Sequence, residues 1–591
     1  MRILLASTAA CALLSLLAAR ALADKPQPRP AEPSDSLTAL IDTELAKVWA
    51  RDGIAPAAPA TDEEFLRRVY LDTVGVPPTY EEATRFLGEP QAGKRAHLID
   101  ALLADERSGL HFANQWALTL VRRDPGPISG GQLFAQWMAA EINAGKGFDS
   151  IARAIVTAQG ALYDNPAIVP YFADGEGIML ADLTGKLNKA LRGVQVQCAQ
   201  CHDHPYDPAL TQKAFEGFAS WFAITKGAVD NDYQPARAYV MQDPAAVKKV
   251  IDLYNKRMTL KPEQRQQVEL YWRYIQPSTP DGTTASQDDP AAWRGKYADW
   301  LLADQNKQTR RYVANRMWSF AFGTGLVNPV DDFTPLNTAS HPELLDALAD
   351  FLPRNGWNLK ALFRAILNSR AYQLSSRKPD PKAQAWHFAA YPVRQLSAEQ
   401  FLGALLNLLA DKQVQDVVKA TRETALAKYA EDLAKAQKDA QEGKSAPNTQ
   451  RYKYDPEGFD KLRKQFEAMP MRWYIARFGA GRYAALSQDD EMNASEGFTG
   501  SIDQALVVMN GSFTNGLAAS TPDSVLGRVT SGFEGTEKRI QALYLHTLSR
   551  KPTAAELQRM VKFSQEQDSK QWAGEDILFA LLMSTEFATN H

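Results

Sequence analysis

The chain has 591 residues, of which 45% are hydrophobic and 10% aromatic, proportions typical of a globular protein with sizeable cores. Its 66 basic and 69 acidic side chains give a net charge of −3 at pH 7. This near balance gives no electrostatic reason to expect nucleic acid or an anionic lipid surface as a partner, and the length allows about two to four domains.

Residues 1–23 are predicted to be a secretory signal peptide. Met1 and Arg2 supply a positively charged start, residues 3–19 form an apolar run, and Ala21-Leu22-Ala23 is a small-x-small cleavage site. A Pro-rich linker is expected at residues 24–35. No later stretch holds about 18 uninterrupted apolar residues, so no transmembrane segment is expected. The mature protein is therefore predicted to be exported, to the periplasm or the extracellular space.

Helical patterns dominate after the linker. The first helix is predicted from apolar residues that recur at i, i+3 and i+4 spacing, namely Leu37, Leu40, Ile41, Leu45 and Val48. Two further helix starts carry the spacing of a capping box, Thr61 with Glu64 and Thr79 with Glu82. Strand signals are few, and the short alternations at residues 191–196 and 238–241 are expected to be minor strands or loops.

The predicted fold class is mainly α, with two helical domains and few short strands. The first helical domain is expected over residues 36–230 and the second over residues 308–591. A connecting region is expected at residues 231–307. The second domain is expected to contain a charged helical insertion at about residues 412–450, because that stretch is rich in Ala, Lys, Glu and Asp and poor in large apolar residues.

Cys198 and Cys201 are the only cysteines after the signal peptide, and His202 follows them directly. Two thiols three positions apart, followed at once by an imidazole, have the spacing for attachment of a c-type haem. In that arrangement both sulfurs form thioethers with the vinyl groups, and the histidine is an axial ligand of the iron. The motif therefore predicts a covalently bound haem c on Cys198, Cys201 and His202.

Two other interpretations remain open. Zinc or non-haem iron takes about four ligands from cysteine, histidine and carboxylate side chains. Besides the two cysteines, the candidate metal ligands are His202, His204, His341, Asp331 and Asp332. In the third interpretation the cysteines form a disulfide or redox pair, in the simplest case a structural disulfide in a non-enzymatic envelope scaffold.

Several separated runs resemble those of one family of exported bacterial proteins. In the first half of the chain these are residues 65–79, 196–207 and 215–222. In the second half they are residues 315–318, 322–327, 331–333, 340–346, 356–362 and 369–376. The chain thus resembles the planctomycete cytochrome-c-related family, in which domain of unknown function 1549 is followed by domain of unknown function 1553. The resemblance covers residues from about 60 to 225 and from about 308 to 588.

The resemblance implies a relation to cytochromes through the Cys-x-x-Cys-His run, and it implies no established activity. The expected function is that of an exported redox protein, which uses haem c for electron transfer or for the oxidation of an unknown substrate. Its expected partner is an unknown redox protein or an extracellular substrate. The alternatives are a metal-dependent periplasmic enzyme that uses zinc or iron, and the envelope scaffold.

Overall fold

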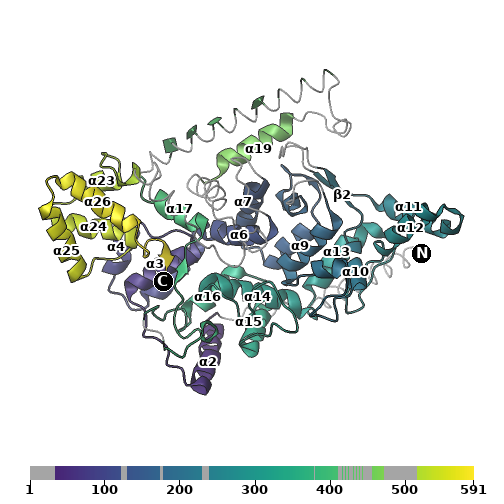
Figure 1. The fold of residues 1–591 in the computed structure, drawn as a ribbon, viewed down its shortest axis with the longest axis horizontal. Coiled ribbons are helices and arrows are strands. Elements are labelled where there is room, and N and C mark those ends of the chain that lie inside the picture. The colour runs from purple at the N-terminus through teal and green to yellow at the C-terminus, as the bar shows by residue number, and fades with distance from the viewer. Residues whose placement is uncertain are drawn as a thin grey trace, which may run out of the picture.

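The structure is a computed structural model that describes residues 34–121, 130–172, 178–228, 239–377, 380–409, 456–470 and 516–591, with isolated positions between 415 and 442. Helices make up most of the regular structure, and the strands form two small sheets (Figure 1). The mainly helical fold class is therefore confirmed. The predicted signal peptide lies outside the described residues, and so does most of the predicted charged insertion.

The three N-terminal helices form largely where the sequence predicts them. α2 (Ser34–Asp52) begins slightly earlier than predicted, and its buried face continues through Trp49 rather than Val48. α3 (Asp62–Thr73) and α4 (Tyr80–Gly88) each begin with a complete capping box, in which threonine and glutamate side chains accept from each other's backbone N–H. Both predicted capping boxes are thus confirmed.

The remaining helices of the first half are α5 (Lys94–Ala104), α6 (Glu106–Leu120), α7 (Gly130–Asn143), α8 (Phe148–Val156), α9 (Leu180–Arg192) and α10 (Gln212–Ser220). Two short 3-10 turns, η1 (Pro166–Tyr171) and η2 (Gln197–Gln200), lie among them. β1 (Gly160–Ala161), β2 (Thr225–Ala228) and β3 (Tyr239–Gln242) form an antiparallel sheet in the order β1-β3-β2. β3 thus forms a minor strand at the second predicted alternation, whereas residues 191–196 end α9 and continue as irregular chain, which agrees with the loop alternative.

The second half is a longer series of helices. They are α11 (Pro244–Asn255), α12 (Pro262–Arg273), α13 (Trp293–Leu302), α14 (Lys307–Phe322), α15 (Pro342–Arg354), α16 (Leu359–Asn368), α17 (Ala398–Leu406), α19 (Pro456–Ala468), α23 (Val525–Gly532), α24 (Thr536–Leu548), α25 (Ala554–Glu566) and α26 (Lys570–Leu582). A second antiparallel sheet pairs β4 (Arg394–Gln395) with β5 (Thr589–Asn590). None of the helices among the described residues is long and apolar enough to cross a membrane.

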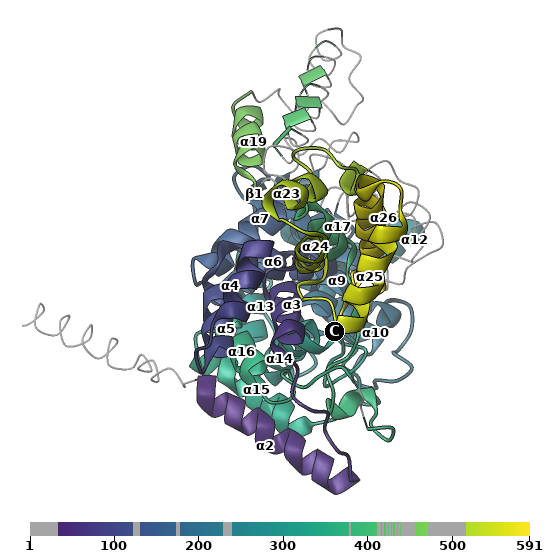
Figure 2. The same ribbon diagram turned by 90° about the vertical axis from the view of Figure 1, so that its left-hand side faces the viewer.

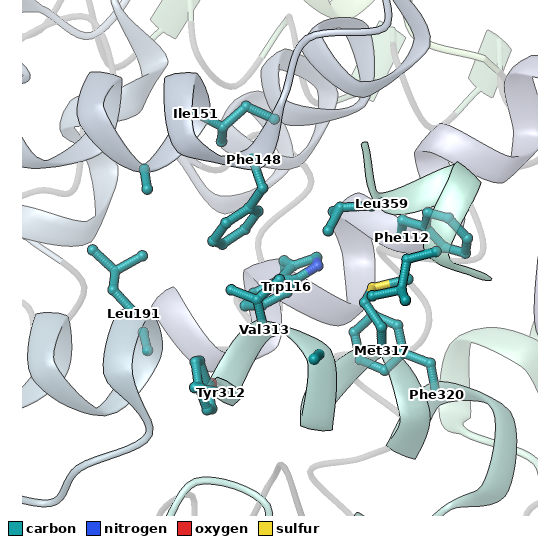
Figure 3. Close-up of a cluster of buried hydrophobic side chains, with 14 of the residues drawn as sticks. Phe112, Trp116, Phe148, Ile151, Leu191, Tyr312, Val313, Met317, Phe320 and Leu359 are labelled. Atoms are coloured by element: carbon teal, nitrogen blue, oxygen red, sulfur yellow. The ribbon is translucent and has the colours of Figure 1, made fainter. Parts of the chain in front are cut away.

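One large hydrophobic cluster unites the two predicted domains. Trp116 of α6 packs against Phe148 of α8, with ring centroids 4.4 Å apart, and against Tyr312 of α14 (Figure 3). α14 also packs against α9, α15 and α16, while α2 lies along α15 and α16 at the base of the molecule (Figure 2). A second cluster joins Leu71 of α3 to residues of α17, α23, α24 and α26. Each of the two clusters thus contains residues from both sides of the predicted connecting region at 231–307.

A buried carboxylate connects α3 to the second half of the chain. Asp72 is 1% exposed, and its Oδ1 accepts from Arg394 Nη2 at 2.6 Å and from Asn590 Nδ2 at 2.7 Å. Its Oδ2 accepts from the hydroxyl groups of Tyr372 and Tyr391, both at 2.8 Å. One side chain of the first predicted domain thus receives hydrogen bonds from four residues of the second.

The two arginines that precede this carboxylate on α3 bind backbone carbonyl groups of distant segments. Arg67 donates to the carbonyl oxygens of Thr547 and Phe587, at 3.2 and 2.8 Å. Arg68 donates to that of Leu374 at 2.8 Å, and its guanidinium lies over the ring of Tyr391. These contacts give the run at residues 65–79 a role in holding the fold together.

A buried histidine makes the stability of this fold depend on pH. Burial, aided by the nearby Arg394 cation, lowers the pKa of His111 from 6.5 to about 4. Between these values the unfolded chain binds one more proton, so acidification from pH 6.5 to pH 4 lowers the unfolding free energy by up to about 1.4 kcal/mol per pH unit. We expect His111→Gln to reduce this slope in denaturant titrations at several pH values. His97→Gln is the control, because His97 is exposed, and an equal change in slope for both variants would contradict the prediction.

Candidate functional site

The Cys-x-x-Cys-His run lies on a short turn between α9 and α10, on the side of the molecule that also carries α11 to α13 (Figure 1). Cys198 belongs to η2, which packs against both α9 and α10, and Cys201 ends that turn. Val196 and Ala199 are fully buried and anchor the turn to the large hydrophobic cluster. The reactive side chains of the motif face outward from this anchored backbone.

Both cysteines are exposed free thiols in the structure. The backbone between them is held in place by Gln212 of α10, whose Nε2 donates to the carbonyl oxygen of Gln200 at 3.2 Å. The turn therefore presents two sulfur atoms to solvent from a supported backbone. Such thiols are accessible to a bulky electrophile without prior opening of the fold.

His202 is exposed, and the hydrogen bond of its ring determines which nitrogen is free. Its Nδ1 lies 2.8 Å from the carbonyl oxygen of Asp203. Because a carbonyl oxygen can only accept, the neutral ring carries its proton on Nδ1 and keeps the lone pair on Nε2. A histidine whose Nδ1–H is bound to a backbone carbonyl has the tautomer suited to metal ligation through Nε2.

The polar loop that follows the motif uses its side chains for its own backbone. His204 N–H donates to the carbonyl oxygen of Leu210 at 2.8 Å, and His204 Nδ1 accepts from the N–H of Tyr206 at 3.3 Å. Asp203 Oδ1 accepts from the N–H of Gln212 at the start of α10, at 2.9 Å. The histidine and aspartate side chains of this loop thus stabilise its backbone, and His204 Nδ1 is already an acceptor for the N–H of Tyr206.

The other predicted metal ligands lie in the second half of the chain and have different partners. Asp331 is 1% exposed and lies 3.3 Å from Lys189 Nζ, while Asp332 accepts from the side-chain amide of Asn337 at 2.7 Å. His341 is buried at the start of α15 beside Phe388, and this burial lowers its pKa to about 4. Among the residues that the structure describes, no three histidine, cysteine or acidic side chains are grouped so that they could hold a metal ion. The structure therefore does not bring the predicted ligands together.

The segment that leads into the motif is nevertheless supported by the Asp331-Asp332-Phe333 run. Phe333 N–H donates to the carbonyl oxygen of Gly193 at 2.8 Å. Gly193 ends α9 with φ of +65°, and a Cβ atom at this position would lie 2.3 Å from the Tyr312 ring. Glycine is required here both by its left-handed conformation and by this close approach.

Replacement of this glycine tests how tightly the approach to the motif is packed. We expect Gly193→Ala to lower the unfolding free energy by about 1–3 kcal/mol more than Gly53→Ala does. Gly53 is the matched control, because its φ is +64° but no atom lies within 4 Å of an added Cβ. Denaturant unfolding of both variants measures this difference in unfolding free energy. Equal losses in the two variants would show that the Tyr312 ring moves aside without destabilising the fold.

Each half of the chain matches a known domain family. Residues 40–226 match PSCyt2, described as a protein of unknown function (DUF1549). Residues 293–564 match PSD1, described as a protein of unknown function (DUF1553). The chain belongs to the family that joins these two domains. The predicted resemblance is thus confirmed, and no curated protein and no solved structure matches the chain.

The PSCyt2 range contains the whole Cys-x-x-Cys-His motif, whereas Asp331, Asp332 and His341 lie in the PSD1 range. Both descriptions leave the activity unassigned, so the function must be inferred from the residues of the candidate site. Sequence reasoning missed Gln212, which supports the motif. A glutamine near the start of a helix carries no local signal that it donates to a carbonyl group twelve positions earlier.

Proposed function

We propose that the protein is an exported redox protein that carries a c-type haem on Cys198, Cys201 and His202. The observation that supports this proposal is the combination of two free, exposed thiols with an adjacent imidazole whose Nε2 lone pair is available. All three groups lie on one turn whose backbone is anchored by buried neighbours. This donor set has the chemistry that attachment of a c-type haem requires.

Attachment needs no oxidant. Each S–H group adds across one vinyl C=C bond, so that a C–S bond forms and the thiol proton moves to the other vinyl carbon. Free thiols are therefore the required starting state, and the structure has both cysteines in that state. The predicted signal peptide fits this chemistry, because c-type haem is attached on the outer side of the bacterial inner membrane.

The protein side chains have distinct roles in this proposal. Cys198 and Cys201 would hold the macrocycle, and His202 would bind its iron through Nε2. The Asp203 carbonyl oxygen accepts the hydrogen bond from Nδ1–H, which orients the imidazole ring. The bound haem supplies one-electron chemistry, for electron transfer with an unknown redox partner or for oxidation of an extracellular substrate.

The two alternative interpretations have less support. For a zinc or iron enzyme, the described residues contain no group of three suitable ligands. A structural disulfide would require the two sulfurs to be joined, and the structure has them as free thiols. The haem proposal gives a role to both exposed thiols and to the exposed histidine that follows them.

The decisive experiment is expression in a bacterium that has the haem-attachment machinery, followed by absorption spectroscopy and intact-mass measurement of the denatured protein. We expect a strong Soret band that stays with the unfolded chain and a mass increase of one haem. A colourless protein with the mass of the bare chain would overturn the proposal. Bound zinc or non-haem iron in elemental analysis, or a mass lower by two hydrogens, would instead favour one of the alternatives.

A further inference from the structure

One residue of α10 bonds both ends of the short segment that carries Cys201 and His202. Gln212 is the first residue of that helix. Its side-chain Nε2 donates to the carbonyl oxygen of Gln200 at 3.2 Å, and its backbone N–H donates to Asp203 Oδ1 at 2.9 Å. Cys201 and His202 thus lie between the two residues that Gln212 binds. We call Gln200, Asp203 and Gln212 the α10 clamp.

The start of α10 is a firm support for this clamp. The N-cap residue Thr211 accepts from the N–H of Ala214 at 3.2 Å, and Phe215 and Phe218 bury the helix in the large hydrophobic cluster. The first N–H groups of a helix have no partner within the helix, so the N–H of Gln212 is available to the Asp203 side chain. Hydrogen bonds to this helix start therefore fix the segment relative to the protein interior.

The clamp reaches the His202 ring through Asp203, which uses both of its oxygen-bearing groups. Its carboxylate accepts from α10, while its carbonyl oxygen lies 2.8 Å from His202 Nδ1. The bond at the carboxylate restricts rotation of the residue and so fixes the direction of the carbonyl group. Because that oxygen accepts only from an N–H group, it selects the neutral tautomer with the proton on Nδ1. A histidine without such a contact favours the opposite tautomer, with the proton on Nε2.

We propose that Asp203 is a positioning residue that, through the α10 clamp, holds His202 in the tautomer able to bind iron before any haem is attached. This inference rests on the proposed function and names the groups that prepare its axial ligand. His202 and Asp203 are both exposed, so water competes for each of their polar groups. The bond from Asp203 to α10 keeps the carbonyl group directed at the ring rather than at solvent. Groups that orient a ligating histidine in this way typically change metal affinity by about 10–100-fold.

The same loop contains a matched control. Asp207 Oδ1 accepts from the N–H of Ala209 at 3.0 Å, so this residue also bonds a backbone N–H group through its carboxylate. The N–H group that it binds belongs to the loop itself and not to α10. Asp207→Ala therefore removes a bond of the same kind and leaves the clamp intact.

Nitrogen-15 NMR of the full chain, labelled at histidine and expressed without the haem-attachment machinery, measures the tautomer of the neutral His202 ring. We expect the Nδ1–H form in the unmutated protein. In Asp203→Ala we expect the ratio of the Nδ1–H form to the Nε2–H form to fall about fivefold, the effect of one hydrogen bond of ordinary strength. Asp203→Asn keeps the acceptor Oδ1 and should restore the ratio, and Asp207→Ala should leave it unchanged. Equal ratios in the unmutated protein and in Asp203→Ala would overturn the inference.

Absorption spectra of the haem-loaded variants supply the second test. In Asp203→Ala we expect the Soret band to move toward that of His202→Asn, whereas Asp203→Asn keeps the native band. Gln212→Ala loses the bond to Gln200 but keeps the backbone N–H, so we expect a smaller change in the same direction. A native spectrum in Asp203→Ala would count against the inference. Absence of haem from the unmutated protein, seen by mass, would instead overturn the proposed function, and the tautomer ratio of the haem-free chain would still decide whether the clamp holds the ring.

Discussion

Replacement of both Cys198 and Cys201 by alanine is expected to abolish covalently bound haem, whereas each single replacement leaves one thioether. Each sulfur forms one of the two bonds to the macrocycle, so the double variant loses the Soret band on denaturation and the mass of one haem. The single variants keep haem at reduced yield, with one unreacted vinyl group and an absorption spectrum shifted to longer wavelength. Haem staining of denaturing gels and intact-mass measurement distinguish these outcomes.

Two histidine variants separate the haem interpretation from the metal interpretation. His202→Asn keeps both thiols, and we expect covalent haem with a shifted Soret band, because the axial nitrogen is lost. In His204→Asn the asparagine Oδ1 can replace His204 Nδ1 as acceptor for the Tyr206 N–H, so we expect an unchanged spectrum. A similar spectral change in both variants would contradict the assignment of His202 as the ligand. Loss of bound zinc or iron from the His204 variant would favour the metal interpretation.

Local sequence signals predicted helix starts well because the bonds that form them are local. Thr61 and Thr79 each bond a glutamate three residues ahead, and this spacing is visible in the sequence itself. The face of α2 was predicted less accurately, since Trp49 rather than Val48 completes it. Which of two adjacent apolar residues is buried depends on the partner helices, and their positions are not encoded locally.

Long-range packing could not be predicted in the same way. The pairing of Trp116 with Tyr312 unites the two predicted domains in one hydrophobic cluster, but neither residue carries a local mark of it. At the candidate site, the sequence predicted the three residues of the motif. It did not predict that Asp331 and His341 have other partners. Spacing identifies residues that act within one turn, and only the fold identifies those that meet across the chain.

We expect Asp72→Ala to lower the unfolding free energy by about 3–5 kcal/mol, the usual cost of removing one partner from a buried ion pair. The carboxylate accepts four hydrogen bonds, and without it the Arg394 cation and the Tyr372 and Tyr391 hydroxyl groups lose an acceptor inside the fold. Asp72→Asn keeps the side-chain volume and one acceptor oxygen, so a smaller loss of about 1–3 kcal/mol is expected. Denaturant unfolding of the purified variants measures both values.

Asp299→Ala is the matched control for this prediction, because Asp299 also pairs with an arginine. Its partner is Arg153 at 2.7 Å, but Asp299 is 67% exposed, and an exposed pair contributes less than about 1 kcal/mol. Similar losses from both aspartates would mean that the Asp72 contacts do little for stability. A large loss at Asp72 alone would show that α3 joins the two halves of the chain through its buried charge. Because Val69 and Leu71 of this helix pack into different hydrophobic clusters, the same charge would then set how cooperatively those clusters unfold.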